Sequence, residues 1–372
     1  MKKELSLLLT LIAPIFLINC SGKTTTMPNP VPNTQSTIIA PPTIITPPIL
    51  GRPIESNSQS NSPNAQPTTV QPTISLPTTI PTLPNQNIGK PPTTHQNGVV
   101  KGTTLLSKKF KLPKKVKESS GLIKIDGRLW TMNDSGGKAE LYQIDEKSGR
   151  LIRTVRIKGA YNHDWEALTY DEQYVYIGDF GNNRGNRRDL KVYKISRAEL
   201  KYKKQIKAKS INFSFSDQKS FRSRPRKHNF DCEAMVAYHG KLFLFSKDWQ
   251  DHKTHLYELS TAIGKHKAYY RDSFNVQGLI TDASINKKLD ILLLTSYSEL
   301  LSVNVWAFTN YKKENFFQGL SKKLTLNSLN AQVEGITFID NYRAYLSSES
   351  FSKYIFSFDS MLYEIDFSKE FQ

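Results

Sequence analysis

Cysteine is scarce in this chain, with only Cys20 and Cys232 among its 372 residues. The sequence around Cys20 predicts that this residue is modified, which would leave Cys232 without a disulfide partner. No cysteine–histidine arrangement in the sequence favours a catalytic thiol. We therefore expect Cys232 to behave as a small, buried hydrophobic residue.

The chain also does not open with an apolar run long enough to cross a bilayer comfortably. The stretch LSLLLTLIAPIFLI within residues 1–20 has 14 residues and follows two lysines, which is typical of a signal peptide. It leads into Leu17-Ile18-Asn19-Cys20, which resembles a bacterial lipobox and predicts lipidation at Cys20. Ser21 resembles the pattern that sorts such proteins to the outer membrane. We expect a lipid-anchored protein of the bacterial cell envelope; a plain signal peptide or an uncleaved anchor is the alternative.

Proline is almost absent from the second part of the chain. Of 19 prolines, 17 lie before residue 100, which leaves only Pro113 and Pro225. Residues 21–103 are rich in threonine, proline, serine and asparagine, and they cannot bury enough apolar surface to offset the loss of chain entropy. We predict that they form a disordered tether and that residues 104–372 form the folded domain.

Acidic residues are outnumbered, and the chain has a formal net charge of +18, of which +15 belongs to residues 101–372. A basic surface suits an anionic partner, either a small substrate such as a phosphate ester or an anionic component of the cell surface. There is no recognition helix and no basic strand interleaved with aromatic residues. We therefore expect no nucleic acid partner.

Helical periodicity is missing after residue 104, whereas two-residue alternation recurs in RLWTM, YVYIG, KLFLF, DILLL and SVNVWAF. Each of five units begins with one polar residue, continues with a small and an apolar residue, and forms a strand, a turn and a second strand. The leading residues are Ser120, Glu166, Glu233, Gln277 and Glu334. These repeats predict an all-β, monomeric, five-bladed β-propeller in which the early strand KKFKL completes the last blade; six blades are the alternative.

The innermost strand of each blade starts just after its leading residue, so we expect the five leading residues to meet at the channel axis. Three of them are glutamates, which would repel one another and raise one another's pKa. Ca²⁺ relieves such repulsion and accepts carboxylate, amide and hydroxyl oxygens, so we predict that the five residues bind it. The alternative is a channel in which these groups only bind water and neighbouring backbone.

The loops after the second strands carry further candidate residues. Asp134 and Asp179 are the candidate catalytic residues, because a carboxylate there would position a water molecule. The candidate substrate-binding residues are Asn133, Asn182, Asn183, Arg184, Arg187 and Arg188. Each loop by itself is also a good turn sequence with no functional requirement.

Several of these motifs together resemble a known family. ESSGL, GRLWTMNDSGG, WEALTY, YVYIGDFG, VQGLIT, NVWAFT and VEGITFI, in this order between Glu118 and Ile339, are similar to the calcium-activated nucleotidases, or apyrases. The resemblance implies a five-bladed propeller with one calcium in the channel, Gln277 replacing a serine ligand, and Asp134 matching an acidic residue associated with hydrolysis. Asn182 and Asn183 replace a Glu-Trp pair of that family. A looser similarity connects the chain to uncharacterised bacterial surface propellers and to esterase-like phytases.

These observations lead to two hypotheses. The first is a membrane-tethered, Ca²⁺-binding propeller that hydrolyses a phosphorylated or other anionic small substrate. The second is a non-catalytic propeller, displayed on a tether, that recognises an anionic surface component or a protein. A propeller fold hosts many functions, so the fold does not choose between them.

Overall fold

The computed structural model describes residues 98–99, 104–298, 302–353 and 356–371, all of which belong to one compact unit. The predicted signal peptide (1–20), the predicted lipidation site Cys20 and nearly all of the predicted tether (21–103) lie outside the described residues. Within the described part, no helix combines the length and the apolar character that crossing a bilayer requires.

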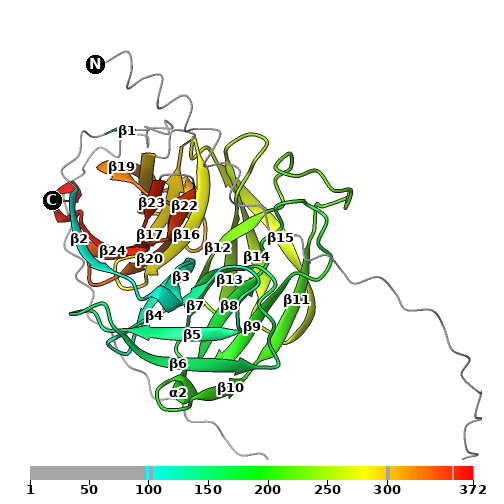
Figure 1. The fold of residues 1–372 in the computed structure, drawn as a ribbon. Helices are drawn as coiled ribbons and strands as arrows, with labels where there is room; N and C mark the ends of the chain where they lie inside the picture. The colour runs from blue at the N-terminus through cyan, green and yellow to red at the C-terminus, as the bar shows by residue number, and fades with distance from the viewer. Residues whose placement is uncertain (1–97, 100–103, 299–301, 354–355, 372) are drawn as a thin grey trace, which may run out of the picture. The chain divides into compact units, whose positions relative to one another are not determined.

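The described chain is dominated by β-strands, most of which pair in successive antiparallel groups of four (Figure 1). The first group comprises β3 (Ser119–Ile125), β4 (Arg128–Asn133), β5 (Glu140–Ile144) and β6 (Leu151–Lys158). The second comprises β7 (Trp165–Tyr170), β8 (Tyr174–Asp179), β9 (Lys191–Ser196) and β11 (Lys209–Phe215). The third comprises β12 (Cys232–Tyr238), β13 (Lys241–Ser246), β14 (Thr254–Ser260) and β15 (Gly264–Phe274).

Two more groups follow along the chain. The fourth comprises β16 (Leu279–Asn286), β17 (Ile291–Tyr297), β18 (Ser302–Thr309) and β19 (Leu320–Asn330). The fifth comprises β20 (Val333–Phe338), β21 (Arg343–Ser348), β24 (Met361–Asp366) and β2 (Leu105–Lys111). In this last group the first long described strand, β2, pairs antiparallel with the last strand, β24, which confirms the predicted pairing of KKFKL (Figure 1).

Shorter elements extend these groups. Strand β10 (Gln205–Lys207) pairs parallel with β6, and β1 (Gly98–Val99) pairs parallel with β19. The remaining short elements are the hairpin of β22 (Phe351–Lys353) and β23 (Phe356–Phe358), the helix α2 (Arg197–Leu200), and the 3-10 turns η1 (Lys114–Val116), η2 (Phe316–Gln318) and η3 (Ser368–Glu370).

Burial explains why the second strand of a group has an almost continuous run of apolar residues. In β13, KLFLFS, every residue after Lys241 is buried, because both faces of the strand pack against a neighbouring group. The outer strand β6 instead alternates between Val155 and Ile157, which are buried, and Arg156 and Lys158, which are exposed. Strands near the axis are therefore more continuously apolar than strands at the rim.

The innermost strands form a closed ring. β3 lies against β7, β7 against β12, β12 against β16, β16 against β20, and β20 against β3. A hydrophobic cluster fills each space between neighbouring groups; Trp130 and Trp165, for example, join the first group to the second. This ring of radially packed sheets confirms the predicted all-β propeller fold. Cys232 is fully buried in the cluster between the second and third groups, as expected for a structural thiol.

Candidate functional site

Each innermost strand has an irregularity at the same place near its start. The antiparallel register shifts there, as in β7, where Trp165 and Ala167 pair with β8 and Glu166 between them does not. A β-bulge leaves one residue unpaired and redirects its side chain. The residues at this position in the five groups are Ser120, Glu166, Glu233, Thr281 and Glu334.

Four of these five are residues that the sequence predicted, and one is not. Gln277 is exposed, has a φ of +51° and precedes the start of β16, so it does not occupy the equivalent position. Thr281 does, and its buried hydroxyl donates a hydrogen bond of 2.7 Å to the carbonyl oxygen of Val333. The spacing between strands could have identified Thr281. In the other units the second strand begins eight or nine residues after the leading residue. Strand β17 begins 14 residues after Gln277 but only ten after Thr281.

A second set of equivalent positions follows the second strands. One backbone hydrogen bond recurs in four groups, from the residue after the second strand to a residue two places before the bulge, with lengths of 2.7 to 3.1 Å. The donors of this bond are Asp134, Phe180, Lys247 and Glu349, and the acceptors are Glu118, Asp164, Asp231 and Gln332. The repeat of one turn geometry therefore places five acidic residues and one lysine around the same end of the channel.

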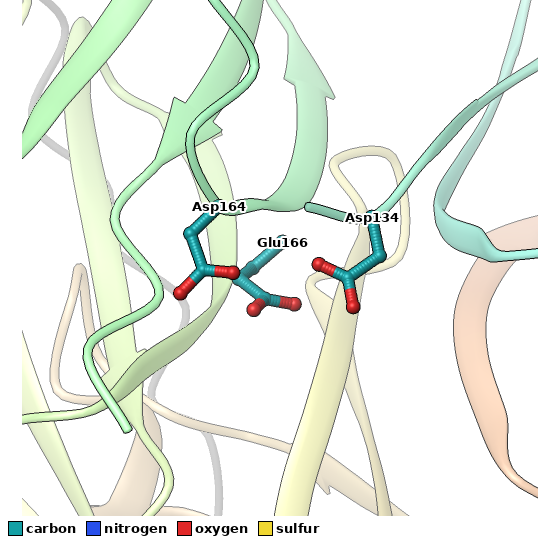
Figure 2. Close-up of side chains that lie close together, drawn as sticks. All are labelled: Asp134, Asp164 and Glu166. Atoms are coloured by element: carbon teal, nitrogen blue, oxygen red, sulfur yellow. The ribbon is translucent and has the colours of Figure 1, made fainter. Parts of the chain in front are cut away.

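Three carboxylates of this end converge closely. One oxygen each of Asp134, Asp164 and Glu166 lies within 4.8 Å of the others, and Figure 2 shows the three side chains turned toward one another. The Ser120 hydroxyl donates to Glu166 Oε2 at 3.3 Å. Gly181 makes room for this arrangement, since a Cβ at that residue would collide with the carboxylates of both Glu166 and Asp164.

Lys247 also lies at this acidic end. Its Nζ is 3.2 Å from Glu233 Oε1, and both side chains are only 3% exposed. The ammonium group also lies over the rings of Trp249 and Tyr297. Lys247 thus supplies a counter-charge to Glu233, and the same ammonium charge lowers the pKa of Asp134 and of Glu166.

The acidic residues strongly disfavour ionisation of one another. Burial raises the pKa of Glu166 well above its usual range, and the charges of Glu233 and Asp134 raise it further. Burial also raises the pKa of Asp134 to about 6, against a backbone hydrogen bond from Ser135 that lowers it. Without a cation, these carboxyl groups can avoid repulsion only by holding protons.

Glu334 adds a further carboxyl group to this environment. It is 6% exposed, and among the described residues no hydrogen bond or ion pair involves its carboxylate. Burial raises its pKa to about 7, with the charge of Lys247 lowering it and that of Asp134 raising it. A buried carboxyl group without a partner is costly, which makes it a candidate ligand for a cation.

The donor set fits a hard divalent cation. Ca²⁺–oxygen distances of about 2.3–2.6 Å place opposite ligand oxygens roughly 4.6–5.2 Å apart, so oxygens within 4.8 Å of one another can share one ion. The group consists of carboxylates alone and contains no histidine or cysteine, which does not favour zinc or copper. Asp164, which the sequence analysis did not select, belongs to this group, whereas Glu233 is already paired with Lys247.

Asp179, the second candidate catalytic residue, has a different environment. Its side chain is buried, accepts a hydrogen bond from the backbone N–H of Asp164 at 3.1 Å, and forms an ion pair of 3.0 Å with Arg187. Asn182 accepts from the backbone N–H of Arg187 and donates to the carbonyl oxygen of Phe230. These contacts make Asp179, Asn182 and Arg187 a buried network that holds the loop beside Gly181.

The other predicted substrate-binding residues are distributed differently. Asn133 donates to the carbonyl oxygen of Lys115, and Asn183 is half-buried in the loop. Arg184 and Arg188 are exposed, and the backbone of Arg184 accepts a hydrogen bond from the backbone N–H of Arg224 in a second basic loop. The exposed cations of these two loops are Arg184, Arg188, Lys219, Arg222, Arg224 and Lys227.

Two cavities in the described part lie away from the two candidate catalytic residues. A cavity of about 410 Å³ lies at the opposite ends of the innermost strands, where Thr169, Thr337 and Lys287 contribute to its wall. A second, of about 910 Å³, lies beside β2 and β6 and includes Ile152. Neither cavity is lined by Asp134 or Asp179.

Comparisons with known proteins do not assign a family. No protein-family model matches the chain, and no curated protein matches it. Among solved structures, a glucose dehydrogenase is similar over 71% of this chain and 100% of its own, with a TM-score of 0.40 and 8% identity. A chain of a nidogen–laminin complex is similar over 71% of this chain and 98% of its own, with a TM-score of 0.36 and 12% identity. The resemblance to calcium-activated nucleotidases therefore stays a prediction.

Proposed function

We propose that this protein is a β-propeller that binds Ca²⁺ at the acidic end of its channel and holds an anionic small molecule beside the ion. The observation that carries the proposal is the convergence of Asp134, Asp164 and Glu166, whose oxygens lie within 4.8 Å of one another. The buried Glu334, whose carboxylate forms no hydrogen bond or ion pair within the described residues, supports it as well. Glu166 and Glu334 are ligands that the sequence predicted, and Asp164 is added here.

The ion would relieve a cost that the folded chain otherwise carries. Burial and mutual repulsion raise the pKa of Asp134, Glu166 and Glu334, so folding without a cation requires that protons be taken up or that like charges remain close together. Binding of a divalent cation to the folded state alone stabilises it by RT ln(1 + [L]/Kd), about 2.7 kcal/mol at a concentration of 100 Kd.

The basic loops next to this end provide the complementary charge for an anionic ligand. Arg187 donates to the carbonyl oxygen of Gly181, the residue that lies against the Asp164 and Glu166 carboxylates, and thereby fixes the arginine-rich loop there. Exposed Arg184 and Arg188 belong to this loop. Guanidinium groups bind phosphate oxygens in a bidentate manner, which favours a phosphorylated ligand.

Calcium titration of the full chain by calorimetry and by thermal unfolding tests the binding proposal. We expect Ca²⁺ to raise the unfolding temperature, a chelator to reverse the shift, and Glu166→Gln to weaken binding at least about tenfold. Glu172→Gln is the matched control, because Glu172 is an exposed acid whose ion pair with Lys287 lies elsewhere. Equal calcium affinity in the wild type and Glu166→Gln would reject the site.

Hydrolysis of the bound anion is a second candidate function, and one observation favours it. The Asp134 carboxylate belongs to the cluster of proposed ligands, where it would hold a water molecule next to a phosphoryl group bound at the ion. A bound cation would polarise a phosphoryl oxygen in such a reaction. Phosphate release from nucleoside diphosphates and phytate, in Ca²⁺ and in chelator, tests the activity. Release that is unaffected by chelator and by Asp134→Asn would reject this candidate and leave the binding proposal standing.

The predicted membrane anchor has its own test. Cys20 lies outside the described residues, and the proposal that it is lipidated comes from the sequence around it. Metabolic labelling with a radioactive fatty acid and fractionation of the cell envelope should show label in the wild type and none in Cys20→Ala. Equal labelling of the two proteins would reject lipidation at this residue.

A further inference from the structure

The outer edge of the first group carries a row of exposed cations that we call the cationic edge. It consists of Arg156 and Lys158 on β6 and of Lys204, Lys207 and Lys209 on or beside β10. Figure 1 shows β6, α2 and β10 next to one another at this edge, and the parallel pairing of β10 with β6 fixes their register. The cationic edge therefore belongs to a rigid sheet.

Nearby acidic groups do not neutralise the cationic edge. Residues 147–163 and 200–216, which supply β6 and β10, contain no aspartate or glutamate. Asp126 is engaged by Arg197 and Lys201, and Glu199 by Lys203. Within the described part of the chain, no ion pair involves any residue of the cationic edge.

Like charges face each other directly within this edge. Lys158 and Lys207 are register partners in the pairing of β6 with β10, and adjacent strands are about 4.8 Å apart. On the other side, Lys209 is the register partner of Lys194 in β9. Like charges at such positions are destabilising, and an anionic surface that covers them removes the repulsion.

Apolar side chains project from the same edge. Tyr202, in the turn between α2 and β10, is 67% exposed, and Ile152 on β6 is 56% exposed. Arg153 connects β6 to the end of α2 by donating to the carbonyl oxygens of Leu200 and Lys201. The edge thus combines basic side chains with a tyrosine and an aliphatic residue, which is the composition of surfaces that lie at a lipid interface.

We propose that the cationic edge docks the propeller on a bilayer with acidic phospholipid headgroups, where Tyr202 and Ile152 enter the interface. Lysines near an anionic bilayer each contribute to binding, and the attraction is screened by salt. A strand edge without a row of aromatic residues does not favour nucleic acid. Charged residues on an edge strand also prevent the strand from pairing with another chain. A variant that tests the proposal should therefore reverse the charges rather than remove them.

Sedimentation of the full chain with vesicles tests the proposal, comparing phosphatidylcholine alone with phosphatidylcholine that contains phosphatidylglycerol. The edge variant is Lys158→Glu, Lys204→Glu, Lys207→Glu, which keeps the edge charged. We expect the wild type to bind acidic vesicles, with affinity that falls as salt rises, and the variant to lose at least about tenfold. The difference between acidic and neutral vesicles removes any contribution of the N-terminal apolar stretch.

The matched control is Lys288→Glu, Lys312→Glu, Lys313→Glu, which changes net charge equally at exposed lysines of other loops. The proposal requires this control to retain binding within about twofold. Equal losses in both variants, or binding of the wild type to duplex DNA but not to acidic vesicles, would overturn it. If the edge variant does not unfold cooperatively and is therefore not folded, the double variant Lys158→Gln, Lys207→Gln replaces it. This double variant must also weaken binding to acidic vesicles.

Discussion

Lys247 Nζ and Glu233 Oε1 lie 3.2 Å apart at the acidic end of the channel, and both side chains are almost fully buried. This pair divides the predicted ring of ligands. Glu233 has a counter-charge at ion-pair distance, whereas Asp134, Asp164 and Glu166 form a group of carboxylates within 4.8 Å of one another. The relationship explains why the proposed cation site includes Asp164 and not Glu233.

Replacing Lys247 with methionine should destabilise the protein in chelator. Burial raises the pKa of Glu233, and the charge of Lys247 opposes that increase. Loss of the ammonium group leaves a buried carboxylate unpaired, at a cost of about 3–5 kcal/mol at pH 8. Urea unfolding measures the loss, and adding Glu233→Gln to the variant should recover most of it. Unchanged stability of the single variant at pH 8 would contradict this role of the ion pair.

Gly181→Ala should weaken calcium binding. The added methyl group would occupy space now taken by the Glu166 and Asp164 carboxylates, so the two groups must move apart. We expect calcium affinity to fall at least about tenfold, measured by calorimetry. Gly137→Ala is the control, since the nearest atoms to a Cβ there are 3.7 Å away. Similar affinities of the two variants would argue against a site next to Gly181.

Substitution of Thr281 should destabilise the protein, whereas substitution of Gln277 should have little effect. Thr281→Val removes the hydroxyl that bonds to the Val333 carbonyl oxygen and to the Thr295 hydroxyl, at a cost of about 1–3 kcal/mol. Gln277→Ala alters an exposed side chain and should change stability by less than about 0.5 kcal/mol. Chemical unfolding of both variants measures the difference. A calcium affinity that depends on Gln277 would restore the original ligand prediction.

Asp248 should make stability fall as pH rises. Burial raises its pKa from 3.8 to about 8, although the Ser246 hydroxyl donates to it and lowers the pKa. Between pH 4 and 8 the folded state holds a proton that the unfolded state has lost, so stability decreases by up to about 1.4 kcal/mol per pH unit. Asp248→Asn should remove this slope and gain about 2–5 kcal/mol relative to the wild type at pH 8. Parallel pH profiles in urea unfolding would contradict the prediction.

The sequence was sufficient to predict the fold class because the patterns that specify β-strands lie within short segments. Two-residue alternation and the repeated strand–turn–strand units specify β-strands without reference to distant residues, and each unit can bury its faces only against its neighbours. The pairing of KKFKL with the C-terminal strand followed from the same requirement, since a ring of sheets leaves one outer strand missing at its end. The lone Cys232 was likewise predictable as a buried residue, because neither a partner thiol nor a histidine arrangement offered it another role.

The tertiary structure alone decided which polar residues meet. Asp164 precedes its bulge by two residues and has the sequence of an ordinary turn, but the packing of the second group beside the first brings its carboxylate to Asp134. Lys247 and Asp179 find their counter-charges at shorter range, Lys247 in Glu233 of the same hairpin and Asp179 in Arg187 of the loop that follows β8. A residue's type and local pattern determine its strand and its burial, whereas its electrostatic partner depends on how separate sheets are placed around the axis. That placement is set by core packing between groups, and no short motif records it.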